Sequence, residues 1–450
     1  MIAHFQRLVG IVLRLAGIDA AVSNVLLGRV WSLISGPISM LLIATTMKPA
    51  EQGFYYTFFS VLALKFFAEM GLQYVVMQFA SHEVAECHLL NGQLFGPARN
   101  LSRLKDLYVK SMAWYIWVSV FIVCSILPAG FWFFLHNNSD GEVHWKGAWI
   151  ALVIAAAMSV LFIPATAIVE GCGAVAEVAK NRMLQGVASG VFLWIPLCLG
   201  AGLYSTAISV FASISVVGIW LYTTKRKFIS KILEANSEFQ IGWKREVLPM
   251  QWRTAVSWIS GYFAYMLFTP MVFATYGADL AGKMGMSLRA TEIIGFTAGA
   301  WLQTKSPIFG RLVAARQWKL LNDSYLSAMR QSIVVFALGA FAFMASLLFL
   351  EHYNAEIYQR FLHARELYIM LGISFLNHII FSRALFMRAF KVEPFYWVFL
   401  LNGLITAGIL IVVLPAFGLF ITLCTVVVTT NLPAIFITGH AIRHIKYSSL

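Results

Sequence analysis

Long apolar stretches separated by short polar ones run along almost the whole 450-residue chain. A helix needs about 20 apolar residues to cross a bilayer, and windows of that size can be placed along the chain. Twelve such windows occur, at residues 24–47, 55–79, 108–134, 147–169, 178–203, 205–223, 252–276, 284–306, 331–350, 366–387, 394–414 and 416–440. The pattern predicts an all-α integral membrane protein with about twelve transmembrane helices.

A twofold repeat runs through these windows. Ser32-Leu-Ile-Ser-Gly36 has a counterpart half a chain length later in Ser257-Trp-Ile-Ser-Gly261. Both copies enter the membrane in the same orientation, as in transporters with parallel repeats. The repeat therefore predicts two six-helix bundles, at 24–223 and 252–440.

The remaining segments are short and rich in basic residues. We expect an amphipathic segment at 1–23, a basic linker at 224–251 and a tail at 441–450. Lys and Arg accumulate in alternate loops and at both ends, whereas only five lie in the other set of loops. The positive-inside rule then places both termini in the cytoplasm. Basic loops of this kind also contact anionic membrane lipids.

Composition excludes several classes of protein. The chain is 60% hydrophobic and 12% charged, with a mean hydropathy of +0.76, too apolar for a soluble enzyme. The net charge of +13 is spread over loops rather than gathered on a soluble domain, so we expect no nucleic-acid partner. The five cysteines form no CxxC pair, and the chain has no HExxH, GxSxG or Walker motif. We expect no metal, no cofactor and no enzymatic activity.

Lys65 and Glu69 lie near the middle of the second window, four residues apart and on one helical face. An ionisable group at this depth costs about 2.5–3.5 kcal/mol, so it usually faces a bundle interior or a watered cavity. The two groups either neutralise each other or act in transport. In the second case Lys65 meets an anionic substrate and Glu69 exchanges a proton or a sodium ion. Arg289 and Glu292 repeat the pattern in the second half and allow the same two interpretations.

Of the other arginines inside windows, two are candidate site residues. Arg29 precedes the helix-bending Gly36-Pro37 and is either an interface anchor or a cavity residue. Arg383 lies deep in the tenth window, near Asn377 and His378. A lone histidine in a span is more often a hydrogen-bonded packing residue than a ligand.

Several short segments resemble a known family. They are Ser-Gly-Pro-Ile-Ser at 35–39, Glu-Gln-Gly-Phe-Tyr-Tyr at 51–56, Gln-Phe-Ala-Ser-His-Glu at 78–83 and Ala-Gly-Lys-Met-Gly-Met-Ser at 281–287. In these segments the chain resembles the Wzx-type O-antigen flippases, the polysaccharide branch of the MOP superfamily, which are relatives of MATE exporters. The twelve-window layout fits this family over the whole chain.

The resemblance implies a protein of the bacterial inner membrane that moves an undecaprenyl-diphosphate-linked oligosaccharide by alternating access. It implies a cationic cavity between the bundles, to which we assign Arg29, Lys65, Arg289 and Arg383 by position and charge. Glu69 and Glu292 would couple transport to a proton or sodium gradient. A polysaccharide polymerase and chain-length proteins would be partners.

Two other functions remain open at this stage. A MATE-like exporter of small amphipathic cations would share the fold, but basic residues in the cavity would repel its substrate. A membrane-embedded glycan transferase would need an acidic or histidine cluster, for which Ser81-His82-Glu83 is the nearest candidate.

Overall fold

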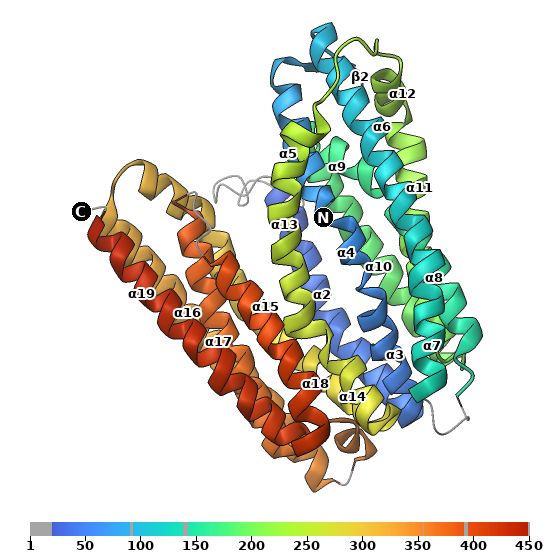
Figure 1. Cartoon of the computed structure of the whole chain (residues 1–450), viewed down its shortest axis with the longest axis vertical. Coiled ribbons are helices and arrows are strands. Elements are labelled where there is room, and N and C mark those ends of the chain that lie inside the picture. Colours follow the sequence, from blue (N-terminus) through green and yellow to red (C-terminus); the bar gives the residue numbers. More distant parts are fainter. Residues whose placement is uncertain (1–19, 91–92, 138–142, 354, 391–394, 449–450) are drawn as a thin grey trace, which may run out of the picture. The chain divides into compact units, whose positions relative to one another are not determined.

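The structure, a computed structural model, describes residues 20–90, 93–137, 143–353, 355–390 and 395–448. Nearly all of the predicted amphipathic segment 1–23 lies outside these residues, as do the last two residues of the predicted tail 441–450. Figure 1 labels the helices and strands in chain order.

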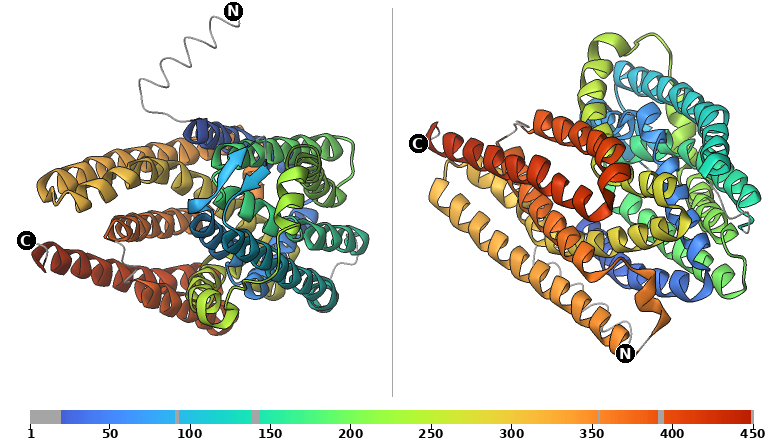
Figure 2. Two further views of the ribbon diagram at one scale, coloured as in Figure 1. Left: turned by 90° about the horizontal axis from the view of Figure 1, so that it is seen from above. Right: turned by 60° about the horizontal axis from the view of Figure 1, so that its bottom comes forward.

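The first half of the described chain is helical apart from one short hairpin. Its elements are α2 (Ala20–Thr46), α3 (Pro49–Leu62), α4 (Lys65–Glu69), α5 (Leu72–Glu83), η1 (Val84–Glu86), β1 (His88–Leu90), β2 (Gln93–Phe95), α6 (Ala98–Phe121), η2 (Ile122–Ile126), α7 (Leu127–Asn137), α8 (Lys146–Val160), α9 (Ile163–Gly171), α10 (Val175–Cys198), α11 (Tyr204–Trp220), η3 (Leu221–Lys225) and α12 (Arg226–Leu233). The strands, drawn as blue arrows in Figure 2, pair antiparallel with Leu89 opposite Leu94.

The regular elements of the second half are all helices within its described residues. Its elements are η4 (Trp243–Val247), α13 (Leu248–Gly261), η5 (Tyr262–Met266), α14 (Phe268–Tyr276), α15 (Ala278–Ala314), α16 (Trp318–His352), η6 (Glu356–Arg360), α17 (Ala364–Arg388), α18 (Tyr396–Val426), η7 (Val427–Asn431) and α19 (Leu432–Ser448).

Large apolar side chains cover the outer faces of these helices. On α16, Phe341 is 74% exposed and Leu338 is 63% exposed, and on α19 Phe436 is 74% exposed. Extensive apolar surfaces of this kind are typical of contact with lipid. A helix suits this environment because it satisfies all of its own backbone hydrogen bonds, so the apolar runs become helices. The predicted all-α membrane fold is confirmed.

Within the described residues, eight helical stretches are long and apolar enough to span a membrane, and a ninth is the bent pair Pro49–Glu69 and Leu72–Glu86. The predicted windows 178–203 and 284–306 coincide with α10 and α15, which fall outside that count. The windows 394–414 and 416–440 merge into one helical stretch, Tyr396–Arg443, but Gly418 interrupts it with φ 83° and ψ 170°.

Five π-helical turns interrupt the described helices: η2, η3, η4, η5 and η7. In three of them a proline follows two residues after the end of the turn, namely Pro128, Pro249 and Pro433. A proline has no N–H and its ring clashes with the carbonyl four residues earlier. Widening the preceding turn removes that clash, so the prolines explain the position of these turns.

The described chain forms two compact units by its internal contacts. The first unit comprises Met1–Leu42, Leu64–Phe131 and His144–Ala255. In it α10 packs on α11, α11 on α8, and α5 on α9. Close approach depends on small residues: a side chain at Gly130 would collide with the indole of Trp149, whose Nε1 donates to the Leu127 carbonyl at 3.1 Å.

The second unit comprises Ile43–Ala63, Trp132–Val143 and Val256–Leu450. In it α3 packs along α15, and α15 also packs on α16 and α17. An apolar cluster that includes Phe309, Tyr325 and Phe386 joins these last three helices. This framework positions the cavity described below.

Candidate functional site

A break in the second predicted span lies beside the two charged residues of that span. Met70 and Gly71 both have left-handed backbone angles, with φ 54° and φ 65°, between α4 and α5. The helices on either side are bent by 43°. A helix end leaves carbonyl groups without intrahelical partners. At this one, Trp114 Nε1 donates to the Ala68 carbonyl at 3.1 Å.

Lys65 and Glu69 are the first and last residues of α4. Glu69 is buried, and its Oε1 accepts a hydrogen bond from the fully buried Tyr115 hydroxyl at 3.1 Å. The Lys65 Nζ lies 5.9 Å from the centroid of the Phe66 ring. Among the ion pairs of the described residues there is none between Lys65 and Glu69. The first unit therefore holds an acid and a base at a helix break without a direct bond between them.

The other predicted site residues belong to other helices. Arg29 lies in α2, half-buried, in the same unit as Lys65. Arg289 and Glu292 lie in α15 of the second unit and form an ion pair of 3.2 Å, with side chains 58% and 38% exposed. Of the two predicted acid–base pairs, this is the one whose charged groups are in direct contact within the described structure. The assignment of Arg29, Arg289 and Glu292 to a transport cavity remains a prediction.

Arg383 lies in α17 and contacts α19. Its Nη1 donates to the Ile435 carbonyl and to the Thr438 hydroxyl at 3.0 Å. The neighbouring His378 is also engaged, because its Nε2 lies 2.7 Å from the Ser332 hydroxyl. Both side chains thus connect helices of the second unit. The assignment of Arg383 to the substrate remains a prediction.

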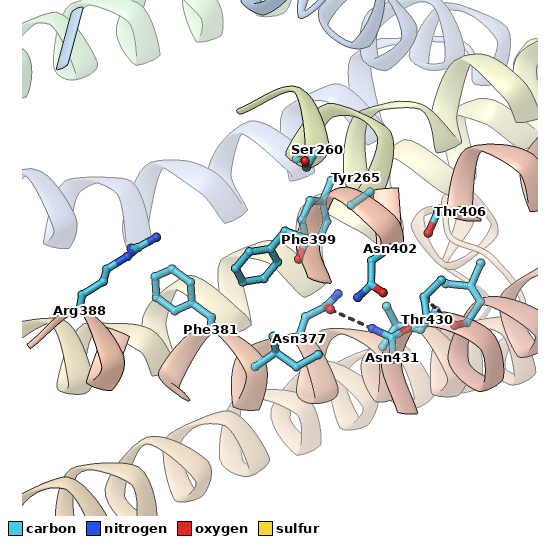
Figure 3. Close-up of a pocket in the computed structure, with 15 residues that line it drawn as sticks. Ser260, Tyr265, Asn377, Phe381, Arg388, Phe399, Asn402, Thr406, Thr430 and Asn431 are labelled. Carbon is cyan, nitrogen blue, oxygen red and sulfur yellow. Dashed lines mark hydrogen bonds between the residues drawn. The ribbon is translucent and has the colours of Figure 1, made fainter. Parts of the chain in front are cut away.

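A cavity of about 230 Å³ lies within the second unit, and Figure 3 shows its lining. Residues of α13, η5, α17, α18 and η7 surround it. On α17 and α18 they recur at helical spacing, as in Ile373, Asn377 and Phe381, or Phe399, Asn402 and Thr406. Arg388 and Phe381 lie at one end, and the three asparagines 377, 402 and 431 gather in the middle (Figure 3).

The polar groups of this cavity are mostly uncharged. Asn431 Nδ2 donates to Asn377 Oδ1 at 2.8 Å. Asn431 is 3% exposed, and its own Oδ1 is buried without a partner within the described structure. A buried polar atom left unpaired costs about 1–3 kcal/mol. None of the lining residues, all of them in the described part of the chain, is acidic.

Two π-helical turns border the cavity. Tyr265 belongs to η5, and Thr430 and Asn431 belong to η7. Such turns rotate the residues that follow them and are frequent at functional sites. In η7 the widened turn precedes Pro433 and places Asn431 on the cavity side (Figure 3).

The sequence analysis missed this cavity because it searched for charged residues in apolar windows. The available signal was one asparagine in each of the tenth to twelfth windows, together with Thr-Asn-Leu-Pro at 430–433. Among the described residues, no group of three or more His, Cys, Asp or Glu side chains is placed to hold a metal ion.

Comparisons with known proteins identify the fold of this chain. No family model matches the chain, and no curated protein matches it by sequence. Solved structures do match over nearly the whole length. One is described as an inward-facing multidrug resistance MATE family transporter of the MOP superfamily, with a TM-score of 0.64, 14% identity, and coverage of 96% of this chain and 98% of that one.

Two further structures agree. The MATE multidrug transporter DinF-BH has a TM-score of 0.60 and 13% identity, covering 94% of this chain and 95% of that chain. A MOP superfamily transporter from Pyrococcus furiosus, described as having a binding pocket of reverse polarity that suggests a different function, has a TM-score of 0.52 and 14% identity, with 96% of both chains covered. This chain is therefore a multi-pass membrane protein of the all-α class. Its fold is that of the MATE transporters of the MOP superfamily.

Proposed function

We propose that this chain is a flippase that moves an undecaprenyl-diphosphate-linked oligosaccharide across the bacterial inner membrane by alternating access. The observation that carries the proposal is the cavity of the second unit, which is lined by amides, hydroxyls and aromatic rings and ends at Arg388. Neutral sugars are rich in hydroxyl groups, so amides bind them by hydrogen bonds. A diphosphate needs a cation, for which guanidinium groups are well suited.

The proposal accounts for Lys65, the base at the helix break of the first unit. Lys65 is half-buried at a helix break, and discontinuous helices in transporters bind substrate or ions near the middle of the membrane. A cation inside an apolar region is unfavourable, so an anionic group of the substrate would be bound there. Glu69, held by Tyr115, is then the acid that exchanges a proton or a sodium ion.

A MATE-like exporter of cations is the second candidate, and the shared fold favours it. A small cation in a site of low dielectric needs an acidic partner. The cavity of the second unit offers it none within the described chain, and Arg388 would repel it. The transporter described as having reverse pocket polarity supports the idea that this fold serves substrates of different charge.

The proposal is tested by deleting the gene and identifying polyprenyl-linked sugars by mass spectrometry. Accumulation of one lipid-linked oligosaccharide together with loss of surface polysaccharide is the expected result. An unchanged lipid pool with new sensitivity to cationic drugs would establish the exporter instead. Truncated glycans would point to a transferase.

Complementation of the deletion tests Lys65. We expect Lys65→Ala to restore less than about a tenth of wild-type export, because loss of a charge-assisted contact of about 1.5–3 kcal/mol lowers the rate at least tenfold. Lys180→Ala, on an exposed position of α10, is the matched control and should restore export fully. Equal export by both variants, at equal membrane abundance, would remove Lys65 from the mechanism.

A further inference from the structure

We propose that the asparagine cluster of the second unit, Asn377, Asn402 and Asn431, is a binding site for an acetamido-bearing sugar. This inference rests on the proposed function and names the part of the substrate that the cavity recognises. The cavity of about 230 Å³ is smaller than the 300–1,000 Å³ of most ligand pockets, so it fits one sugar residue rather than a whole oligosaccharide.

The hydrogen bond between the Asn377 and Asn431 amides determines which donor and acceptor groups the pair offers to a ligand. Asn431 Nδ2 donates to Asn377 Oδ1, which leaves Asn377 Nδ2 as a donor and Asn431 Oδ1 as an acceptor. If both amide groups are flipped by 180°, one residue again offers an unbonded NH2 group and the other an unbonded carbonyl oxygen. An acetamido group offers one N–H and one carbonyl oxygen, which is the complement of this pair.

The unpaired acceptor indicates that the site binds a ligand with a hydrogen-bond donor. Asn431 Oδ1 is buried, and the residue as a whole is 3% exposed, so bulk water reaches it poorly. The hydroxyl of Thr430 already donates to the Val426 carbonyl at 2.6 Å and therefore cannot serve Asn431. A ligand N–H would relieve the unfavourable burial of that oxygen.

The apolar part of the lining favours an acetamido group over a plain hydroxyl. Ile373, Ile380 and Val426 surround the amides with aliphatic side chains, against which a methyl group packs. The rings of Phe381 and Phe399 offer flat apolar surfaces to the carbon face of a sugar ring (Figure 3). Because the lining has no acid within the described chain, a free amino sugar, which is cationic, would not be bound there.

Binding of two synthetic lipids to the purified full chain in nanodiscs tests the site. Both carry farnesyl diphosphate, joined in one to N-acetylglucosamine and in the other to glucose. We expect the wild type to bind the acetamido lipid at least about tenfold more tightly, because the glucose lipid has one hydroxyl in place of the separate N–H and carbonyl of the acetamido group and no methyl group to pack on the aliphatic lining. In Asn431→Leu, which has a similar volume, the two affinities should differ by less than about twofold.

Thr429→Val is the matched control, since Thr429 belongs to the same π-helical turn but is exposed and does not line the cavity. It should keep the wild-type preference. If Asn431→Leu does not fold, the partly exposed Asn402→Leu takes its place and should also weaken the preference.

The outcomes separate the two proposals. Equal affinity of the wild type for both lipids would overturn the acetamido site while leaving the flippase intact. A preference that survives Asn431→Leu would likewise overturn it. Failure of the wild type to bind either lipid would overturn the proposed function, and with it this inference.

Discussion

Met70 and Gly71 determine the path of the chain at its most unusual point. Both adopt left-handed angles directly after Glu69, and Met70 is a residue type for which such angles are strained. A backbone that keeps this conformation inside an apolar region must be stabilised by its surroundings. Trp114 supplies part of that stabilisation through the Ala68 carbonyl.

Gly71→Ala should lower the free energy of unfolding by about 1–2 kcal/mol, because a Cβ in the left-handed region clashes with the following carbonyl. Gly71→Asn should lower it less, since asparagine tolerates these angles. Gly372→Ala, in a helix and with nothing within 4 Å of the added Cβ, is the control. Thermal unfolding of the purified protein in detergent measures all three. Equal stability of Gly71→Ala and Gly372→Ala would contradict a rigid break.

At the residue scale, the sequence analysis identified the charged residues inside apolar windows and overlooked the uncharged amides. Lys65 and Glu69 were conspicuous because charges are rare in apolar windows. Asn377 and Asn431 were not, because a single amide in a span is compatible with ordinary packing. Their importance depends on the mutual hydrogen bond and on the orphaned oxygen, which only the folded chain reveals.

At the scale of elements, the contact between α3 and α15 depends on glycines. A Cβ at Gly53 would collide with the Ala278 carbonyl, and one at Gly282 would lie 2.9 Å from the Gly53 nitrogen. The adjacent Gln52 Nε2 donates to the Gly282 carbonyl at 2.9 Å. This crossing resembles the small-residue packing of membrane helices, in which two backbones approach closely.

Gly53→Ala should therefore destabilise the protein by about 1–3 kcal/mol, the usual effect of overpacking a tight contact. The same substitution at Gly372 should be neutral or slightly stabilising, because alanine favours helices and the space there is open. Unfolding in detergent gives the comparison. Should Gly53→Ala prove as stable as Gly372→Ala, the close approach of α3 and α15 would not be required.

The elements also show what periodicity can and cannot predict. Apolar windows identified the helices, because an apolar run in lipid has one way to satisfy its backbone. Windows did not predict the break after Glu69, which depends on backbone angles rather than hydropathy. The turns before Pro128, Pro249 and Pro433 could have been predicted, since proline frees the carbonyl four residues earlier.

At the scale of the whole molecule, the twofold repeat and the contact units divide the chain differently. The repeat predicts bundles at 24–223 and 252–440, whereas Ile43–Ala63 and Trp132–Val143 join the second unit by their contacts. Segments of the first half therefore pack with the second half, as α3 does with α15. Sequence windows cannot show this, because they contain no information on contacts between distant segments. The domain boundaries of the sequence analysis remain predictions.

The two acids assigned to ion coupling now differ in environment, and this difference gives a test of the whole transport cycle. Glu69 is 4% exposed and bonded to Tyr115, whereas the Glu292 side chain is 38% exposed and paired with Arg289 on the same helix. A group that binds and releases an ion during transport must be shielded from bulk water for part of the cycle. Glu69 meets that requirement and Glu292 does so less well.

We therefore expect Glu69→Gln to make transport in inverted vesicles insensitive to the proton or sodium gradient, while Glu292→Gln keeps that dependence. The amide oxygen that Glu69→Gln introduces can still accept the hydrogen bond of Tyr115, so the variant should fold. Flipping of a fluorescent diphosphate-linked sugar, measured with and without each imposed gradient, separates the two. Gradient dependence retained by Glu69→Gln would exclude that residue. Loss of the dependence in Glu292→Gln alone would transfer the coupling role to α15, because only an acid that titrates during the cycle can link substrate movement to the ion.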